Sequence, residues 1–448
     1  MIKKPMSFGR YFNFEHEIES LAWQYDAPSF LANSFSETGN RKILPYGKGR
    51  SYGDSCLNEN GTLLCMSHMN KVLAFDKNTG VLTCEAGFTI GEIIRLVSPH
   101  GWFVPVSPGT KHVTVGGAVA NDVHGKNHHI RGAFGNNISS IKLMTSDGKT
   151  HFLKPEDPLF KATVGGIGLT GLILEVTINL IKGSSWFETE NIKFEKLEDF
   201  FTISDESERD FEYTVAWIDS TAINENLGRG IYMRGNHATD PSLPLKNPRP
   251  LFSVPMNLPN FALNQYSVKA FNWLYYNKQF GKRESGIVHF EPYLYPLDVI
   301  NDWNKIYGKR GFHQYQFVIP EDARNSLKDV FKIIARSGQA SFLTVLKKFG
   351  DMKPVGMLSF PTPGYMVALD FANLEEKTDK LFARLDQIIE SVGGRLYPAK
   401  DSKMSGELFE KFYPNLSEFK KYVDPNFSSS FWRRVTSTKY EDKVKENL

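Results

Sequence analysis

The amino-acid sequence predicts an α+β protein with two domains. Its 448 residues are enough for about two or three domains of ordinary size. Up to about residue 184 the chain carries short strand-like runs, many glycines and few helices, whereas from about residue 185 strand patterns alternate with strongly amphipathic helices. We therefore expect a first domain over residues 1–184 and a second over residues 185–396, built on an antiparallel sheet backed by helices.

Local signals place the elements of the first domain. Runs of strand length occupy residues 62–66, 81–86, 140–145, 149–153 and 172–181. Asp147 and Gly148 separate the third run from the fourth, which predicts a hairpin. Thr89 and Glu92 have the spacing of a capping box, so we expect a helix to begin there and to end near Gly101.

The second domain shows a different pattern. Strand patterns cover residues 213–219, 314–319, 342–347 and 365–371. Apolar side chains recur at helical spacing from about Glu321 to Ser337, and Gly338 follows as a stop. A second amphipathic helix ends at Gly393 and Gly394. A sheet covered by helices on one face explains both patterns.

Composition narrows the class of protein. A hydrophobic content of 41% with 23% charged residues is ordinary for a globular protein, and a net charge of +3 is too small to indicate nucleic-acid binding. Cys56, Cys65 and Cys84 form no CxxC pair, so neither a zinc site nor a disulfide framework is expected. A reducing compartment is the simplest setting.

The chain gives no sequence signal for export or membrane insertion. Its N-terminus is basic but has no apolar run behind it, which makes a poor secretory signal. No stretch reaches about 18 uninterrupted apolar residues, since even residues 172–181 contain Glu175 and Asn179. We expect a cytoplasmic protein whose contact with the inner face of a membrane is at most peripheral.

Two glycine-rich segments suit one shared ligand. They cover residues 46–54 and 108–117, and the histidine-rich residues 124–129 follow. Glycines let the backbone approach phosphate oxygens closely, and the small residues 116–120 can open a helix whose N-terminus favours an anion. Together the segments predict a diphosphate held between them, and hence a bound dinucleotide, FAD in the first place. Either segment alone could equally be a tight turn.

These segments resemble the vanillyl-alcohol oxidase family of FAD-binding proteins, the PCMH type, and within it the enzymes that oxidise a lipid-linked ribose. The resemblance runs from Gly9 to Pro425. Its most specific parts are residues 49–54, 113–118, 124–129, 168–171, 314–320, 358–360 and 399–402. It implies an FAD-binding first domain, a substrate domain, and a C-terminal segment, residues 397–448, that returns to the FAD-binding domain.

The resemblance also implies roles for individual residues. Lys400 is expected beside the flavin, as a fixed cation that stabilises its reduced state, with Tyr52 and His124 as further catalytic residues. The implied FAD-binding residues are Tyr46, Gly47, Lys48, Gly49, Arg50, Ser51, Tyr52, Gly53, Asp54, Pro108, Gly109, Thr110, Thr114, Gly116, Gly117, Asn121, His124, Gly125, Asn127, Ile173 and Tyr397. The implied substrate-binding residues are Lys126, Trp217, Gln314, Gln316, Lys347 and Lys400. Without the resemblance, Lys400 could be a solvated surface lysine and Trp217 a core residue.

Two departures from the family pattern affect the expected chemistry. Many relatives bind the flavin covalently through a histidine in the first loop, but Arg50, Ser51 and Tyr52 supply none, so FAD should be bound non-covalently. Ala368 stands where the ribose-oxidising relatives have a cysteine that faces the site. The redox chemistry does not need that thiol, but its loss should prevent capture by thiol-directed inhibitors. Residues 292–296 match the family only loosely, which leaves substrate detail open.

Two motifs could indicate other functions. Residues 166–171 match the dinucleotide pattern GxGxxG, but a strand-like run follows them where that motif requires a helix. His124, His128 and His129 could bind a metal, yet Gly125 and Asn127 argue against a helix there, and no carboxylate or thiolate completes a ligand set. We expect neither a nicotinamide-binding Rossmann site nor a metal centre.

Residues 240–261 contain six prolines interleaved with apolar side chains. This segment could be a mobile surface loop that cannot join a sheet, because proline lacks a backbone donor. It could also be a lid or a lipid-facing flap, extended to a membrane interface by Phe271, Trp273, Tyr275 and Tyr276. The residues alone leave both interpretations open.

The resemblance implies an FAD-dependent oxidoreductase that oxidises a secondary hydroxyl, the 2-hydroxyl, of a polyprenyl-phosphate-linked ribose to a ketone. A separate NAD(P)H-dependent short-chain reductase would then restore the alcohol with inverted configuration, toward the arabinose sugar. An oxidase of a soluble sugar alcohol or aldonolactone is an alternative, and so is a flavin-binding scaffold without turnover that serves a partner reductase. The electron acceptor and the oligomeric state are not readable from the sequence.

Overall fold

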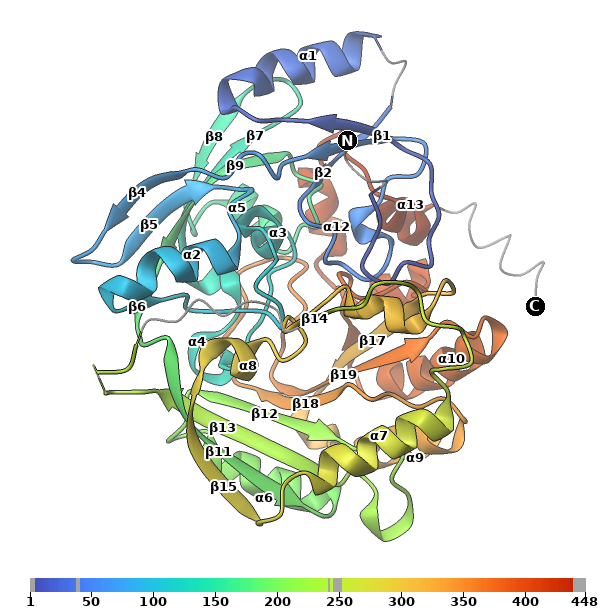
Figure 1. Cartoon of the computed structure of the whole chain (residues 1–448). Helices are drawn as coiled ribbons and strands as arrows, with labels where there is room; N and C mark the ends of the chain where they lie inside the picture. Colours follow the sequence, from blue (N-terminus) through green and yellow to red (C-terminus); the bar gives the residue numbers. More distant parts are fainter. Residues whose placement is uncertain (1–4, 38–40, 241, 245–251, 438–448) are drawn as a thin grey trace.

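The computed structural model describes residues 5–37, 41–240, 242–244 and 252–437 (Figure 1). It confirms the α+β class: antiparallel sheets and helices are mixed along the chain. The boundaries of the predicted domains, at 184/185 and 396/397, remain predictions.

The N-terminal part contains two larger sheets and one pair of short strands within the described residues. An antiparallel sheet of five strands has the order β4 (Val72–Asp76), β5 (Val81–Glu85), β9 (Leu172–Asn179), β7 (Ile138–Met144), β8 (Thr150–Leu153). A parallel sheet of three strands has the order β1 (Glu17–Ser20), β3 (Thr62–Cys65), β2 (Ile43–Tyr46). The short strands β6 (Trp102–Phe103) and β10 (Ile181–Lys182) pair with each other. The helices are α1 (Ala27–Glu37), α2 (Ile90–Val97), α3 (Val115–Ala120), α4 (His128–Arg131) and α5 (Pro158–Thr163).

Several local signals are confirmed here. Thr89 caps α2, with its side chain and that of Glu92 closing the predicted capping box. The helix passes into a short 3₁₀ turn and stops at Gly101, whose φ of 72° is left-handed. β7 and β8 form the predicted hairpin, and β9 follows the GxGxxG residues as a strand. A nicotinamide-binding motif would need a helix at that place.

The later part of the chain is built on a large antiparallel sheet, which has eight strands within the described residues. Their order is β15 (Arg283–His289), β11 (Trp186–Phe194), β13 (Gly230–His237), β12 (Tyr213–Ile218), β18 (Thr344–Phe349), β19 (Gly364–Ala372), β17 (Phe312–Ile319), β20 (Arg395–Leu396). The helices are α6 (Leu197–Ser207), α7 (Gln265–Asn277), α8 (Phe290–Leu294), α9 (Ser326–Arg336), α10 (Glu376–Ser391), α11 (Gly406–Phe412), α12 (Leu416–Phe419) and α13 (Ser430–Thr436). The predicted helix at 321–337 begins with a 3₁₀ turn, Glu321–Ala323, before α9.

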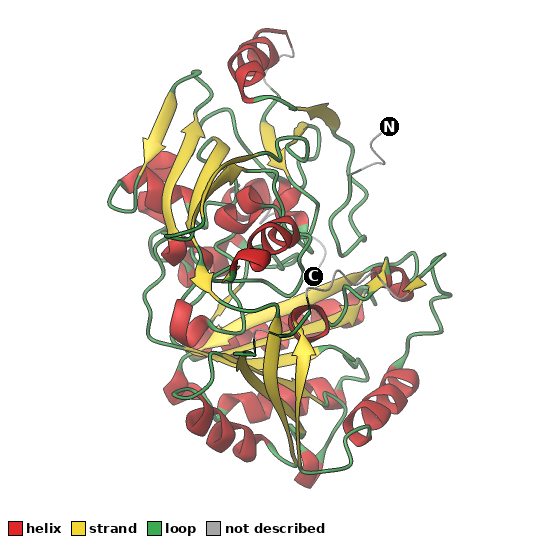
Figure 2. Ribbon diagram, turned by 60° about the vertical axis from the view of Figure 1, so that its left-hand side comes forward, coloured by secondary structure: helices red, strands yellow, loops and turns green. Residues whose placement is uncertain are grey.

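The two faces of the large sheet have different roles. Helices cover the face turned away from the N-terminal part (Figure 2). On β17, Tyr315, Phe317 and Ile319 pack into that helix-covered core, whereas Gln314 and Gln316 point to the other face, because side chains alternate along a strand. Each large apolar side chain buried in such a core stabilises the fold by roughly 1.5–3 kcal/mol. The apolar core thus lies on the helix-covered face, and polar side chains such as Gln314 and Gln316 lie on the opposite face.

The C-terminal segment lies beside the first strands of the chain, as Figure 1 shows for α12 and α13 near β2. Asn426 and Ser428 exchange backbone hydrogen bonds with Ile43 on β2. Arg434 donates two hydrogen bonds to Asp54 and one to Asp401, and all three side chains are buried. This ion-pair cluster ties residues 401 and 434 to the first glycine-rich segment.

Candidate active site

A cavity of about 670 Å³ lies between the glycine-rich segments and the open face of the large sheet. Both segments line it, together with strands β12, β17, β18 and β19. Its volume is within the usual range for cofactor and small-molecule sites. The predicted site residues that line it are Gly47, Lys48, Gly49, Arg50, Ser51, Tyr52, Pro108, Gly109, Thr110, Thr114, Gly116, Gly117, Asn121, His124, Gly125, Lys126, Ile173, Trp217, Gln314, Gln316, Lys347, Tyr397 and Lys400.

Glycine is required where the two segments meet. A Cβ atom on Gly47 would lie 2.4 Å from Oγ1 of Thr114, so a larger residue would push the segments apart. Thr114 uses the same oxygen to cap α3, accepting from the N–H of Gly117. Gly49 has a φ of 59°, a left-handed conformation that glycine adopts most easily. The backbone of the first segment therefore packs directly against the Thr114 side chain of the second segment along one wall of the cavity.

Gly53, which is predicted to bind FAD, does not line the cavity. A Cβ atom there would lie 1.6 Å from the carbonyl oxygen of Asp401. The N–H of Tyr52 also donates to the carbonyl of Ala399 at 3.0 Å. The close approach of these backbones brings Lys400 into the cavity, with its Nζ 3.9 Å from the centre of the Tyr52 ring. Gly53 thus positions Lys400.

Three other predicted FAD-binding residues also lie outside the cavity lining. The hydroxyl of Tyr46 donates to the carbonyl of Met6 at 2.9 Å. Asp54 accepts from Arg434, and Asn127 donates to the carbonyl of Pro105 at 2.8 Å. The structure gives each of these side chains a role in holding a loop.

His124 is held by two partners from the large sheet. Nζ of Lys347 lies 2.9 Å from Nδ1 of His124 and donates to the carbonyl of Gly125 at 2.6 Å. Nε2 of His124 lies 2.7 Å from the terminal amide of Gln316. Burial, followed by the charges of Lys347, His128 and Lys400, lowers the pKa of His124 well below its usual value, so the imidazole is neutral near pH 7.

Three lysine amines give the cavity an unusual electrostatic character. Burial lowers the pKa of Lys126 to about 7. Burial also lowers the pKa of Lys400 to about 8, although the Asp370 carboxylate opposes this shift. The pKa of Lys347 is lowered well below its usual value, first by burial and then by the charge of Lys126. Because an anion between them would favour their protonated forms, these amines suit a negatively charged ligand.

Sequence reasoning missed one buried carboxylate next to the site. Asp370 accepts a hydrogen bond from Nε2 of Gln314 at 2.6 Å, and its second oxygen is buried without a hydrogen-bond partner among the described residues. Burial raises its pKa to about 7, with Gln314 and Lys400 opposing the shift. The alternation of side chains along β19 is the one sequence signal for the position of Asp370. It does not reveal that Gln314, on the neighbouring strand β17, is its partner.

A second missed group closes the cavity near the second glycine-rich segment. Asp298 accepts from the hydroxyl of Thr110 at 3.0 Å and from the N–H of Lys111 at 2.8 Å. Tyr293, in the loosely matched residues 292–296, accepts through its carbonyl a hydrogen bond from Lys126. These contacts order the loop over the cavity mouth, although its sequence carries no motif.

The sequence is similar to that of known flavoprotein oxidases. Residues 33–154 match the FAD binding domain family. The chain is 37% identical to decaprenylphosphoryl-β-D-ribose oxidase of Mycolicibacterium smegmatis over 89% of this chain and 90% of that protein. It is 31% identical to an uncharacterised protein of Streptomyces coelicolor, over 78% of this chain and 99% of that protein. L-Gulonolactone oxidase of Mus musculus is 28% identical over 34% of each chain.

The chain belongs to the decaprenylphosphoryl-β-D-ribose oxidase family of FAD-dependent enzymes. It is therefore an FAD-dependent oxidoreductase, as the sequence predicts. The residues of the structure fit the cofactor. Within the described chain, the N–H groups of Lys48, Gly49 and Arg50 donate no hydrogen bond, and they lie on a segment that lines the cavity. Unpaired amides of this kind suit the oxygens of a diphosphate.

One expectation about local structure is wrong. Gly125 and Asn127 were expected to prevent a helix, but α4 begins immediately after Asn127, at His128. Asn127 lies outside the helix, with a φ of −112°, in agreement with the preference of asparagine for non-helical backbone. Among the described residues, no group of three potential metal ligands is close enough to hold an ion.

The proline-rich segment is only partly described. Residues 241 and 245–251 lie outside the described residues, so the flap interpretation cannot be followed there. Phe252–Ser253 forms a short strand, β14, that pairs in parallel with β16 (Ile300–Asn301), so this part does join a sheet. It can do so because neither residue is a proline. None of the helices in the described ranges is long and apolar enough to cross a bilayer.

Proposed function

We propose that this oxidase converts the 2-hydroxyl of a polyprenyl-phosphate-linked ribose to a ketone. The observation that carries the proposal is the group of three amines, Lys126, Lys347 and Lys400, on one cavity with the glycine-rich segments. Buried lysines with lowered pKa values gain most from a ligand that restores their charge, and a phosphodiester does so. The name of the Mycolicibacterium smegmatis relative supports the same substrate class.

The reaction removes a hydride from carbon and a proton from the hydroxyl oxygen. FAD, when bound, supplies the hydride acceptor. The Lys400 ammonium favours the negative charge that the site gains on reduction, because it is held in a cavity of low polarity. The proton leaves to a base or to water. Gln316 and the neutral His124 orient the sugar, and Lys126 and Lys347 bind its phosphate.

The ketone is the product that a second enzyme would consume. A nicotinamide-dependent short-chain reductase returning hydride to the opposite face would invert the carbon and complete an epimerisation toward arabinose. We propose such a reductase as the partner of this oxidase, which is the first half of the pair.

The test is to mix the enzyme anaerobically with lipid-phosphoryl ribose and to measure the bleaching of the flavin by stopped-flow absorbance. Lys400→Ala should keep FAD bound but slow bleaching by about 100-fold or more, as for loss of one charged stabilising group. Lys403→Ala is the matched control, because Lys403 pairs with Asp379 at 3.0 Å and does not line the cavity. Bleaching of Lys400→Ala at the wild-type rate would remove Lys400 from the mechanism.

The choice of reductant separates the alternatives. Reduction by L-gulono-1,4-lactone or a soluble polyol, in place of the lipid-linked sugar, would assign a soluble substrate. If none of these compounds bleaches the flavin, the protein is better explained as a flavin-binding scaffold without turnover. Rapid reduction by the lipid-linked ribose alone is the expected result.

A further inference from the structure

Exposed apolar side chains gather around α7. Of the nineteen large hydrophobic side chains that are exposed in the described ranges, ten lie between residues 252 and 287. We call six of these the α7 face: Phe261, Tyr266, Phe271, Trp273, Leu274 and Phe280. Exposed fractions reach 74% for Tyr266 and 96% for Phe280. A concentration of this kind marks a surface that meets a partner or a membrane.

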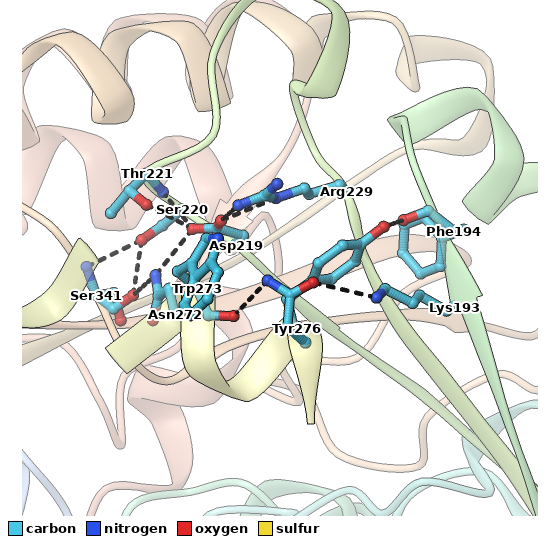
Figure 3. A network of polar contacts seen from close by, with 11 residues as sticks. Lys193, Phe194, Asp219, Ser220, Thr221, Arg229, Asn272, Trp273, Tyr276 and Ser341 are labelled. Atoms are coloured by element: carbon cyan, nitrogen blue, oxygen red, sulfur yellow. Dashed lines mark hydrogen bonds and ion pairs between the residues drawn. The ribbon is translucent and has the colours of Figure 1, made fainter. Parts of the chain in front are cut away.

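Polar contacts fix the buried side of α7 to the large sheet (Figure 3). Asn272 donates to Asp219 at 3.0 Å and to the carbonyl of Ser341 at 3.2 Å. The hydroxyl of Tyr276 donates to the carbonyl of Phe194 at 3.1 Å. Asp219 is itself paired with Arg229 at 2.7 Å. The helix is therefore anchored to the large sheet by buried hydrogen bonds.

Figure 3 also shows how cations support the anchor. Nζ of Lys193 lies 4.2 Å from the centre of the Tyr276 ring, and the Arg229 guanidinium lies 4.7 Å from it. Tyr266 and Trp273, which are seven residues apart, lie on the same side of the helix and are both exposed, whereas Asn272 and Tyr276 are buried. The network therefore holds α7 in an orientation that leaves Tyr266 and Trp273 exposed.

Basic residues outnumber acidic residues around the α7 face. Residues 252–287 contain four cations, Lys269, Lys278, Lys282 and Arg283, all exposed, and Glu284 is the one acidic residue among them. Exposed aromatic rings beside lysines are typical of surfaces that lie in the interface of an anionic bilayer.

The α7 face is continuous with the substrate cavity. Tyr275 of α7 and Lys278, the C-cap residue of that helix, line the cavity together with Trp217 of β12. Rings lead outward from it: Trp217 and Tyr275 are 4.6 Å apart between centroids, and Tyr275 and Phe271 are 5.9 Å apart. An apolar chain leaving the cavity along these rings reaches the α7 face.

We propose that the α7 face docks the oxidase on the surface of an anionic phospholipid bilayer. Trp273, Tyr266 and Leu274 enter the interface, while Lys269 and Lys282 contact the headgroups. The cavity then opens toward the membrane, and a lipid-linked substrate enters sugar first while its chain stays on the apolar side. The statement about substrate entry rests on the proposed function, but docking itself does not.

The test is sedimentation of the flavin-loaded protein with vesicles, without substrate. Wild type should bind vesicles of equal parts phosphatidylcholine and phosphatidylglycerol and leave pure phosphatidylcholine unbound. The variant Tyr266→Ser, Trp273→Ser, Leu274→Ser should bind about tenfold more weakly. Its matched control, Tyr25→Ser, Phe152→Ser, Leu73→Ser, replaces three exposed apolar side chains of the N-terminal part and should bind like wild type.

Charge is tested in the same way. Lys269→Glu with Lys282→Glu should weaken binding to the anionic vesicles about tenfold, whereas Lys77→Glu with Lys154→Glu, on exposed positions of the N-terminal part, should not. Quenching of tryptophan fluorescence by brominated lipid should fall in Trp273→Phe, which is a conservative change. Equal sedimentation of the two triple variants, or no binding by wild type, would overturn the proposal.

Two further outcomes assign the face differently. Dimerisation of wild type in analytical ultracentrifugation, lost in the α7 variant, would assign the face to a second copy of the chain and overturn the proposal. If the wild type does not bind vesicles but its flavin is bleached normally by detergent-solubilised lipid-phosphoryl ribose, docking is refuted and the proposed function still holds. Vesicle binding without bleaching would refute the proposed function alone.

Discussion

Nζ of Lys347, on β18, lies 2.9 Å from Nδ1 of His124 and 2.6 Å from the carbonyl oxygen of Gly125. One amine from the large sheet thus fixes both the imidazole and the backbone of the histidine-rich segment. The next residue, Lys348, points to the other face of the sheet and pairs with Glu321 at 2.9 Å. Two adjacent lysines therefore serve opposite faces of one strand, as strand geometry requires.

Lys347→Met should weaken substrate binding more than it slows flavin reduction in the enzyme–substrate complex. Loss of the amine leaves the Gly125 carbonyl without its donor, at a cost of about 1–3 kcal/mol, and removes one cation from the cavity. Stopped-flow bleaching at varied substrate concentration separates the dissociation constant from the limiting rate. Lys348→Met is the matched control and should leave both unchanged. A fall in the limiting rate alone would contradict the assigned role in binding.

Asp370→Asn should move the alkaline limb of the activity profile to lower pH. Burial lowers the pKa of Lys400 to about 8, although the Asp370 carboxylate opposes this shift. Activity that needs the ammonium is lost as pH rises through this pKa. Removing the negative charge lowers the pKa of Lys400, so the loss begins earlier. Because the pKa of Asp370 is about 7, the effect should be visible above that pH.

The control for this profile is Asp386→Asn. Burial raises the pKa of Asp386 to about 7 as well, but its partner is the hydroxyl of Tyr315 and it does not line the cavity. Its profile of kcat/KM against pH should coincide with that of wild type. Coincidence of the Asp370→Asn profile with wild type would mean that Lys400 does not control the alkaline limb.

Gly53→Ala should yield protein with little bound FAD. The added Cβ would meet the Asp401 carbonyl at 1.6 Å, and backbone cannot yield as a flexible side chain does. The turn that carries Lys400 must then move away from the first glycine-rich segment. Absorbance near the flavin maximum, divided by protein concentration, measures the loss. Gly286→Ala, where a Cβ meets nothing within 4 Å, should retain the cofactor fully.

Arg434→Met should destabilise the fold strongly. It leaves Asp54 and Asp401 buried without their guanidinium, and breaking a buried pair from one side costs roughly 3–5 kcal/mol. The variant should show a lower Tm at matched heating rate, and also release FAD earlier. Arg209→Met, which breaks an ion pair at the exposed surface, should leave Tm unchanged. An unaltered Tm in Arg434→Met would show that the cluster is unimportant for stability.

Acid precipitation should release the flavin completely. Arg50, Ser51 and Tyr52 supply no histidine on the first glycine-rich segment that could form a covalent link. The supernatant after heating in acid should be yellow and fluorescent, and the precipitate colourless. Colour that stays with the precipitate would demonstrate a covalent bond, and mass spectrometry of its peptides would locate the residue.

Elements with local signals were predictable from the sequence. The capping box at Thr89, the hairpin at Asp147 and the helix stop at Gly338 each depend on neighbouring residues, and each is where it was expected. The gathering of the lysines on one cavity followed from resemblance, since no local pattern relates Lys126 to Lys347. Asp370 and the close approach of Gly53 to Asp401 were missed, because both depend on contacts between residues that are far apart in the sequence.

The closure of Gly53 on Asp401 has a consequence for biosynthesis. The first glycine-rich segment leaves the ribosome long before the turn with Lys400 and the Arg434 side chain have been synthesised. Until residue 434 has emerged, the nascent polypeptide has an incomplete cavity, and Asp54 and Asp401 lack the guanidinium that pairs with them. Loading of the flavin should therefore be a late, post-translational event, and a premature stop before residue 400 should yield colourless chains that proteases remove.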